Sequence, residues 1–251
     1  MKINPHPTYY LLTSGRIKHK KTMIWIEDFI SLLYPKICAA CGNSLWSHEK
    51  IICTSCDFYL PKTNFHKLQE NPISQLFWGR EQIHSAAAYL FFNKGSRVQQ
   101  LIHQLKYRGR KDIGVFLGNL YGTCLQQSES FNDIELIIPV PLHKKKLMKR
   151  GYNQSDQFGL GLSATMKIPM NNQVLIRSRE TETQTKKARF KRWENVDNIF
   201  MVKNFQHLTG KKILLVDDVI TTGATLESCI HALSEIPEVR ISIAAIAVAL
   251  H

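Results

Sequence analysis

The segment at residues 213–225, ILLVDDVITTGAT, combines residue types that suit a phosphorylated sugar. Its apolar residues predict a buried strand, and two adjacent carboxylates, Asp217 and Asp218, follow at the carboxyl end of that strand. In open α/β sheets, ligands bind beyond the carboxyl ends of the strands. A small, hydroxyl-rich loop then leads into a helix, whose first N–H groups are free to bind an anion. The loop residues that we assign to a phosphate are Thr221, Thr222, Gly223, Ala224 and Thr225.

The acids and the loop have a simpler interpretation, a capped helix after a strand whose carboxylates are merely solvated. We disfavour it because adjacent acids at the end of a buried strand are costly without a partner. The segment resembles the diphosphate-sugar motif of the type I phosphoribosyltransferases. This resemblance implies that Asp217 and Asp218 are the catalytic pair and hold the ribose 2- and 3-hydroxyls of phosphoribosyl diphosphate. It also implies that residues 221–225 hold the 5-phosphate.

A second segment, at residues 139–159, reads PVPLHKKKLMKRGYNQSDQFG and is strongly basic. In the type I family the loop after an early strand binds diphosphate. Here the clustered lysines and arginines would stabilise a leaving diphosphate and its Mg²⁺. The residues assigned to the diphosphate are Pro141, Leu142, His143, Lys144 and Arg150. The alternative is a cationic surface loop without a ligand.

A third segment, at residues 177–200, is polar and basic and has no continuous apolar period. It falls between two predicted strands. Type I phosphoribosyltransferases close a mobile loop at this position over the active site to exclude water. The candidates within it are Gln184, Arg189, Arg192 and Asn195. A disordered connector is the alternative.

Four of the six cysteines form two C-x2-C pairs with eleven residues between them. Two such turns can place four thiolates around one ion, an arrangement that suits Zn²⁺. The predicted ligands are Cys38, Cys41, Cys53 and Cys56. A closed thiolate cage leaves no open position, so we expect a structural metal; an iron–sulfur cluster or a redox role is the alternative. We find no credible secretory signal that would favour disulfides.

The formal net charge is +13, and it is concentrated in three segments. Residues 1–22, 143–152 and 177–192 each carry a net charge of +5, so the rest of the chain is close to neutral. Such blocks point to polyanionic partners, either phosphorylated metabolites or nucleic acid, although a solvated basic face is the simpler reading. The composition excludes a mainly disordered chain, and no apolar run is long enough for a membrane-spanning helix.

The pattern along the chain predicts an α/β fold with a parallel sheet covered on both faces by helices. Strands are expected at 85–92, 136–142, 174–176, 212–219 and 240–250, and helices at 95–108, 116–125, 153–165 and 225–236. The predicted organisation is a disordered basic arm or upstream extension at 1–22, an N-terminal helix with a four-cysteine zinc module at 23–61, a linker at 62–84, and a phosphoribosyltransferase-like domain at 85–251.

Taken together, these features resemble the ComF family of competence-associated phosphoribosyltransferase-like proteins. The resemblance also includes the Lys106-Tyr107-Arg108-Gly109 turn and covers residues 23–250. It implies a type I phosphoribosyltransferase fold, structural Zn²⁺, Mg²⁺ bound with phosphoribosyl diphosphate, and a cytoplasmic role in DNA uptake with competence proteins as partners. No acceptor-base pocket can be read from the sequence.

A different class of function is therefore kept open. In it the chain is a non-catalytic single-stranded DNA-binding or adaptor protein on the same scaffold. The basic blocks would track the backbone of the DNA. The aromatic residues available to stack on its bases are Tyr107, Tyr152, Phe190 and Trp193.

Overall fold

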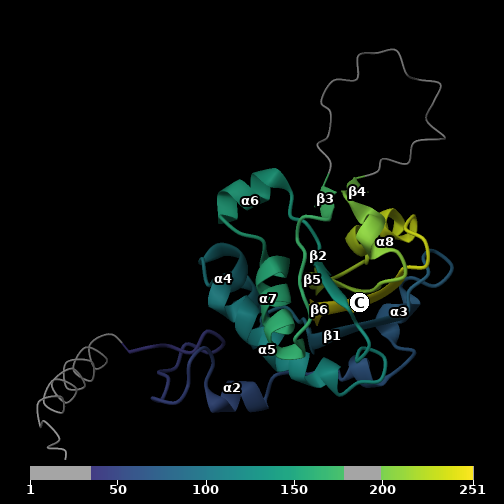
Figure 1. The fold of residues 1–251 in the computed structure, drawn as a ribbon. Helices are drawn as coiled ribbons and strands as arrows, with labels where there is room; N and C mark the ends of the chain where they lie inside the picture. The colour runs from purple at the N-terminus through teal and green to yellow at the C-terminus, as the bar shows by residue number, and fades with distance from the viewer. Residues whose placement is uncertain (1–34, 178–198, 251) are drawn as a thin grey trace, which may run out of the picture.

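The computed structural model describes residues 35–177 and 199–250 (Figure 1). Its centre is a four-stranded parallel sheet in the order β1-β6-β5-β2. The strands are β1 (Ser85–Phe91), β2 (Leu136–Pro139), β5 (Lys212–Ile220) and β6 (Arg240–Val248). Short apolar runs produce these strands, as expected for a parallel sheet that is buried on both faces. The predicted parallel α/β architecture is confirmed.

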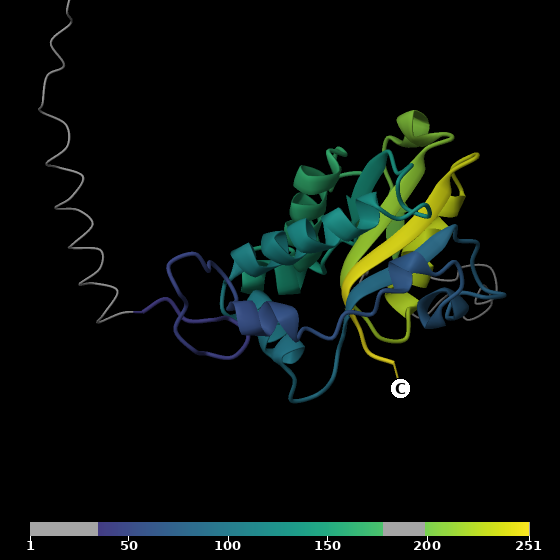
Figure 2. The same cartoon turned by 90° about the horizontal axis from the view of Figure 1, so that it is seen from below.

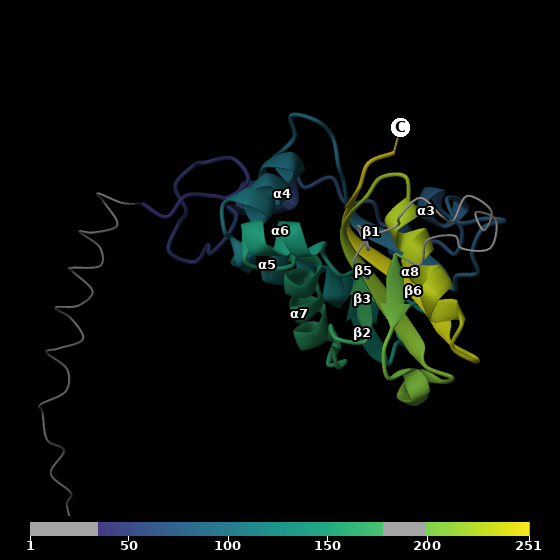
Figure 3. The same ribbon diagram turned by 90° about the horizontal axis from the view of Figure 1, so that it is seen from above.

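Helices cover both faces of the sheet (Figures 1 and 3). One face carries α4 (Arg97–Tyr107), α5 (Lys111–Gln126) and α7 (Gln154–Met166), and the other carries α8 (Ala224–Ser234) and the short α3 (Pro72–Gln75). The four helices predicted within 85–251 are present, and α5 begins five residues earlier than expected. Its first turn reads KDIG, in which Ile113 is the only large apolar residue, so the apolar signal there is weak.

Helices α5 and α7 approach each other backbone to backbone. A Cβ atom placed on Gly118 would lie 2.3 Å from the carbonyl oxygen of Phe158. One placed on Gly161 would lie 2.2 Å from the carbonyl oxygen of Val115. No side chain fits at either glycine, so these two positions set the spacing between the helices.

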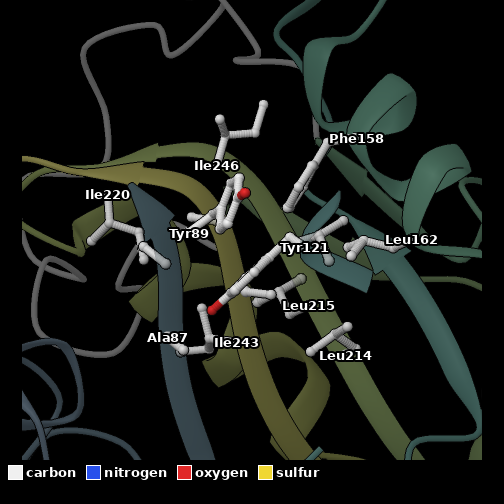
Figure 4. Packing of buried hydrophobic residues seen from close by; sticks show 14 of the residues in the cluster. Ala87, Tyr89, Tyr121, Phe158, Leu162, Leu214, Leu215, Ile220, Ile243 and Ile246 are labelled. Atoms are coloured by element: carbon white, nitrogen blue, oxygen red, sulfur yellow. The ribbon is translucent and has the colours of Figure 1, made fainter. Parts of the chain in front are cut away.

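An aromatic cluster fills the space between this helix pair and the sheet (Figure 4). Tyr121 of α5 and Phe158 of α7 are fully buried there. The ring of Tyr121 lies 5.1 Å from the ring of Tyr89 on β1 and 6.4 Å from that of Phe158, centroid to centroid. Burial of this size contributes about 2 kcal/mol or more for each large side chain.

The segment at 62–84, expected to be a linker, is packed against the sheet. Asn71 caps α3, and its side-chain amide donates a 2.8 Å hydrogen bond to the carbonyl oxygen of Ala86 in β1. Ile73 and Phe77 are fully buried. The short helix η1 (Phe65–Lys67) also contacts β1. The segment is polar for most of its length, and a few apolar residues such as Ile73 and Phe77 hold it in place.

The basic run, expected to belong to a diphosphate-binding loop, is a helix, α6 (Lys144–Arg150). His143 caps its start, and Gly151, with φ 76°, closes its end. Lys, Leu, Met and Arg are all good helix formers, which explains why the run is helical although none of its residues is buried.

The strand predicted at 174–176 lies outside the parallel sheet. It is β3 (Leu175–Arg177), which pairs antiparallel with β4 (Phe200–Val202). The short helix η2 (Phe205–Leu208) follows and leads to β5.

The four-cysteine segment lies at one end of the molecule, beside α4 and away from the sheet (Figures 2 and 3). It contains α2 (Thr54–Phe58) and an isolated antiparallel bridge between Ile37 and Ser44. The side-chain amide of Gln104 on α4 donates a 2.7 Å hydrogen bond to the carbonyl oxygen of Ala39, which ties the module to the domain. The predicted helix at 23–34 and the arm at 1–22 lie outside the described residues.

Candidate functional site

The two acids lie in the last part of the central strand β5, at the carboxyl edge of the sheet. Asp217 is in register with Ala245 of β6, and the strand continues to Ile220. Both carboxylates are half-buried, and the side chain of Asp218 is 14% exposed. A parallel sheet collects its ligand-binding groups at this edge, so the acids stand where the sequence predicted them.

Three groups hold the acid pair. The hydroxyl of Ser155 on α7 donates a 3.0 Å hydrogen bond to Oδ1 of Asp217, and the backbone N–H of Asp218 donates to the same oxygen at 2.8 Å. The ammonium of Lys106 on α4 lies 2.9 Å from Oδ1 of Asp218. Three elements that are distant in the sequence therefore meet at two adjacent residues.

Asp217 has an unusual acidity. Burial raises the pKa of Asp217, and the neighbouring charge of Asp218 raises it further. The hydrogen bonds from Asp218 and Ser155 and the charge of Lys106 lower it, and the net result is a pKa of about 7. The pair can therefore gain or lose a proton close to neutral pH.

The predicted phosphate loop joins β5 to α8. Gly223 precedes the helix with φ 80°, a conformation that favours glycine, and this N-cap residue has no side chain to cap the first turn. The hydroxyl of Thr222 accepts one long hydrogen bond, 3.5 Å, from the N–H of Ala224. Thr221, Thr222, Ala224 and Thr225 are exposed. A helix start without an N-cap side chain, next to two carboxylates, suits an anion that carries hydroxyl groups.

Phe77 lies beneath this loop. A Cβ atom on Gly223 would lie 3.3 Å from Cζ of Phe77, so the glycine rests directly on the ring. The segment at 62–84 thus supports the loop as well as the sheet.

The loop after β2 runs beside the acids. The N–H of Val140 donates a 2.9 Å hydrogen bond to the carbonyl oxygen of Val216, the residue before Asp217. The side-chain amide of Asn153 donates to the carbonyl oxygen of Val140 at 2.9 Å. Pro141, Leu142 and His143, predicted to bind diphosphate, continue directly from this anchored residue and are half-buried.

The other two diphosphate candidates lie on α6. Lys144 is exposed. Arg150 donates a 2.6 Å hydrogen bond to Oε1 of Gln154 and lies 5.2 Å from the ring centre of Tyr107. Arg150 is thus held between α4 and α7, whereas Lys144 faces solvent.

The four cysteines form a compact cluster. Their sulfur atoms all lie within 4.8 Å of one another, and those of Cys41 and Cys53 are 3.8 Å apart. A tetrahedron with metal–sulfur bonds of about 2.3 Å requires sulfurs separated by about 3.8 Å, so the residues fit such an ion. Burial alone would raise the pKa of Cys38, but N–H donors of Cys53, Cys41 and Ala40 outweigh it and lower the pKa to about 7.

A family model described as a phosphoribosyl transferase domain matches residues 157–249. DNA utilization protein YhgH of Shigella flexneri is 30% identical over 198 residues, which are 76% of this chain and 80% of that protein. Competence protein F of Haemophilus influenzae is 33% identical over 130 residues, which are 50% of this chain and 57% of that protein. The chain belongs to the ComF family of phosphoribosyltransferase-like proteins.

The fold of this ComF-family protein is accordingly the type I phosphoribosyltransferase fold with an N-terminal four-cysteine module. Glutamine phosphoribosylpyrophosphate amidotransferase from B. subtilis aligns with 56% of this chain and 30% of its own length, with 22% identity and a TM-score of 0.39. So distant a similarity adds nothing to the assignment. No helix in the described part of the ComF-family chain is both long and apolar enough to cross a bilayer.

The remaining site predictions fall outside the described residues. Gln184, Arg189, Arg192 and Asn195 belong to the segment at 178–198, which separates β3 from β4. Their assignment to a loop that closes over the site stays a prediction.

Two residues in contact with the acid pair were not predicted as site residues, Lys106 and Ser155. Lys106 lies in a turn that belongs to the ComF resemblance, but the sequence gives no sign that its ammonium reaches Asp218. Ser155 is the third residue after Tyr152 in the GYNQS stretch, where a serine has no distinctive signal. Only the packing of α4 and α7 against β5 places them at the site.

Proposed function

We propose that this chain binds phosphoribosyl diphosphate together with Mg²⁺ at the carboxyl edge of the sheet. The observation that carries the proposal is the juxtaposition of the held acid pair with the start of α8, where the N-cap residue is a glycine. The match of residues 157–249 to a phosphoribosyl transferase domain supports the ligand class.

Each group has a role in this proposal. Asp217 and Asp218 accept hydrogen bonds from the ribose 2- and 3-hydroxyls, and residues 221–225 hold the 5-phosphate by their N–H and hydroxyl groups. The loop at 141–143 and the cations of α6 face the diphosphate. Carboxylate and diphosphate oxygens are the hard ligands that Mg²⁺ prefers, so the donor set fits the ion, which would neutralise the leaving group.

The reaction would be displacement of diphosphate at the anomeric carbon. A bond forms between that carbon and a nucleophilic atom of the acceptor, and the bond from the carbon to the diphosphate oxygen breaks with its electron pair. The acceptor loses a proton. The chain's own part is to orient the ribose and to stabilise negative charge on the departing group. Neither aspartate needs to act as a nucleophile.

The test is calorimetric titration of phosphoribosyl diphosphate and Mg²⁺ into the wild type and an Asp217→Asn, Asp218→Asn double variant. We expect saturable binding by the wild type and at least about a hundredfold loss in the variant, because two hydroxyl contacts to charged groups disappear. The matched control is Asp133→Asn, Glu135→Gln. It removes two carboxylates that pair with Lys212 and Lys211 at the amino edge, and it should bind like the wild type. A folded wild type that does not bind would overturn the proposal.

The cysteine cluster is proposed to hold structural Zn²⁺. Four thiolates at tetrahedral spacing suit this ion, and a module this small gains most of its stability from a bound metal. The test is elemental analysis of the purified protein, in which we expect one zinc ion per chain in the wild type and its loss in Cys41→Ser. A coloured preparation that contains iron would instead favour an iron–sulfur cluster.

The biological role proposed is the handling of DNA during its uptake, in the cytoplasm and together with competence proteins. The support is the naming of the relatives for DNA utilization and competence. An acceptor is not specified by any group at the site.

A second candidate function is binding of single-stranded DNA, which the exposed helix α6 favours. Four lysines and one arginine lie on seven residues, none of them buried. Tyr107, 59% exposed, stands next to Arg150 and offers a stacking surface. The test is the affinity for an oligothymidylate as a function of salt. A Lys144→Gln, Lys145→Gln, Lys146→Gln variant should bind more weakly and show a shallower salt dependence. Unchanged affinity would remove this candidate.

A further inference from the structure

Lys106 forms an ion pair with the acid pair from an element that is distant in the sequence. Its Nζ lies 2.9 Å from Oδ1 of Asp218, and the two side chains are only 22% and 14% exposed. Ion pairs on the open surface contribute little, but partial burial reduces screening by water and strengthens the attraction. In each of the other ion pairs of the described residues, by contrast, at least one of the two side chains is 34% exposed or more.

The last turn of α4 is anchored on two sides, which fixes Lys106. Leu105 is fully buried, and its carbonyl oxygen accepts a hydrogen bond from the hydroxyl of Tyr152. Gln104 is bonded to the cysteine module through the carbonyl oxygen of Ala39. The residue next to these two anchors is the one whose ammonium reaches the acids.

In the described part of the chain, the other groups beside the acids, on α7 and α8, are neutral. Ser155 of α7 is a neutral hydrogen-bond donor, and Cys229 of α8 is a buried thiol whose pKa is raised by burial and by the charge of Asp217. The charge of Arg177 on β3 lowers the pKa of that thiol, but by less than burial raises it. Within the described part of the chain, Lys106 is the cation paired with the two carboxylates.

We infer that Lys106 is a positioning residue of the sugar-phosphate site, whose ammonium holds the carboxylate of Asp218 in place for the ribose hydroxyls and favours the charged form of the acid pair. This inference rests on the proposed binding of phosphoribosyl diphosphate. Helix α4 would then contribute to ligand binding, although it lies outside both the acid-pair motif and the basic segment.

The effect of losing Lys106 on ligand binding should depend on pH. Without the ammonium, Asp217 would retain its proton to higher pH, because the charge of Lys106 is one of the causes that lower the pKa of this carboxyl. A protonated pair is a poorer acceptor for two hydroxyls. Binding should therefore weaken near neutral pH and recover as the pH rises. An arginine at this position would preserve the charge.

The experiment is calorimetric titration of phosphoribosyl diphosphate and Mg²⁺ between pH 6 and pH 9 into the wild type, Lys106→Met and Lys106→Arg. We expect Lys106→Met to bind at least about tenfold more weakly at pH 7 and to regain most of that loss by pH 9. Lys106→Arg should stay within about threefold of the wild type. The control is Arg97→Met, which removes an exposed cation from the other end of α4, about 13 Å away, and should bind normally.

A second measurement follows the carboxyl carbons of the acid pair by NMR during a pH titration without ligand. The titration of Asp217 should move to higher pH in Lys106→Met and stay near the wild-type position in Lys106→Arg. Thermal unfolding of each variant shows whether it is folded.

The outcomes separate the two proposals. No binding by a folded wild type overturns the proposed function and this inference together. Binding by the wild type with an unchanged Lys106→Met overturns this inference alone. An equal loss at every pH, with the carboxyl titration unmoved, would mean that Lys106 only supports the fold, and this also overturns it.

Discussion

At the scale of single residues, the acid pair combines burial with mutual repulsion. Asp217 lies beside Asp218 in β5, one of the two inner strands of the sheet, and its pKa is raised to about 7. Ordinary aspartates titrate near pH 4. Between these two values the folded chain holds a proton that the unfolded chain has released, so the stability of the fold falls as the pH rises through that window.

Asp217→Asn should therefore gain stability relative to the wild type as the pH is raised. We expect the difference in free energy of unfolding to change by about 1–3 kcal/mol in favour of the variant between pH 5 and pH 8. Chemical denaturation at several pH values measures it. Glu135→Gln is the control, since the pKa of that exposed carboxyl is lowered by Lys211 and should give no such gain. A pH-independent difference for Asp217→Asn would contradict the raised pKa.

At the scale of elements, two close contacts at glycines set the geometry of the site. One joins the backbones of two helices, and the other places a backbone turn on an aromatic ring. Glycines bring α5 and α7 together, and α7 carries Ser155 to the acid pair. Phe77 supports the turn at Gly223, where α8 begins. In both cases a small residue permits an approach that a larger one would prevent.

Gly118→Ala should destabilise the fold by about 1–3 kcal/mol or more, although alanine is the better helix former. The added methyl group would meet the carbonyl oxygen of Phe158 and push the two helices apart. Chemical denaturation measures the change. Thr123→Ala, at an exposed position of the same helix, should leave the stability nearly unchanged or raise it. Equal stabilities for the two variants would show that the helices can separate at no cost.

Phe77→Ala should weaken phosphate binding without touching the ligand. The ring supports Gly223, and its loss leaves a cavity under the loop, with a cost in stability of about 3–5 kcal/mol. The affinity for ribose 5-phosphate, measured where the variant is fully folded, checks the first effect. Phe131→Ala removes another fully buried ring and serves as the control. A similar loss of affinity in both variants would point to general destabilisation.

At the scale of the whole molecule, the cysteine module and the sugar-phosphate site are joined through one helix. Gln104 connects α4 to Ala39, which lies between two of the cysteines, and Lys106 connects the same helix to Asp218. A change in the module therefore has a short covalent and hydrogen-bonded route to the acid pair.

Removal of metal by a chelator should loosen residues 38–58 and the last turn of α4, while the parallel sheet stays protected. The cause is the loss of the cluster that holds the module on Gln104. Amide hydrogen exchange with and without chelator measures it, with a Gln104→Leu variant to break the link. In that variant the module should still loosen, and α4 should no longer respond. A uniform loss of protection would mean that the metal stabilises the whole domain instead.

The sequence by itself determined the parts of this protein that depend on local pattern. The apolar runs predicted the strands of a parallel sheet, and the carboxyl end of one run placed Asp217 and Asp218 at the ligand-binding edge, because strand direction fixes that edge. The spacing of the four cysteines predicted a single cluster. These inferences need only the period of a strand, the start of a helix and the reach of a tight turn.

Only the tertiary structure decided which distant residues meet at the acids. Lys106 and Ser155 are separated from Asp218 by more than sixty residues, and nothing in their neighbours indicates the contact. The support of the phosphate loop by Phe77 also depends on packing, since an apolar residue in a polar segment is expected to be buried but its neighbours in sequence do not say against what. Local pattern specifies each element, whereas the partners of a side chain are set by how the elements pack against one another.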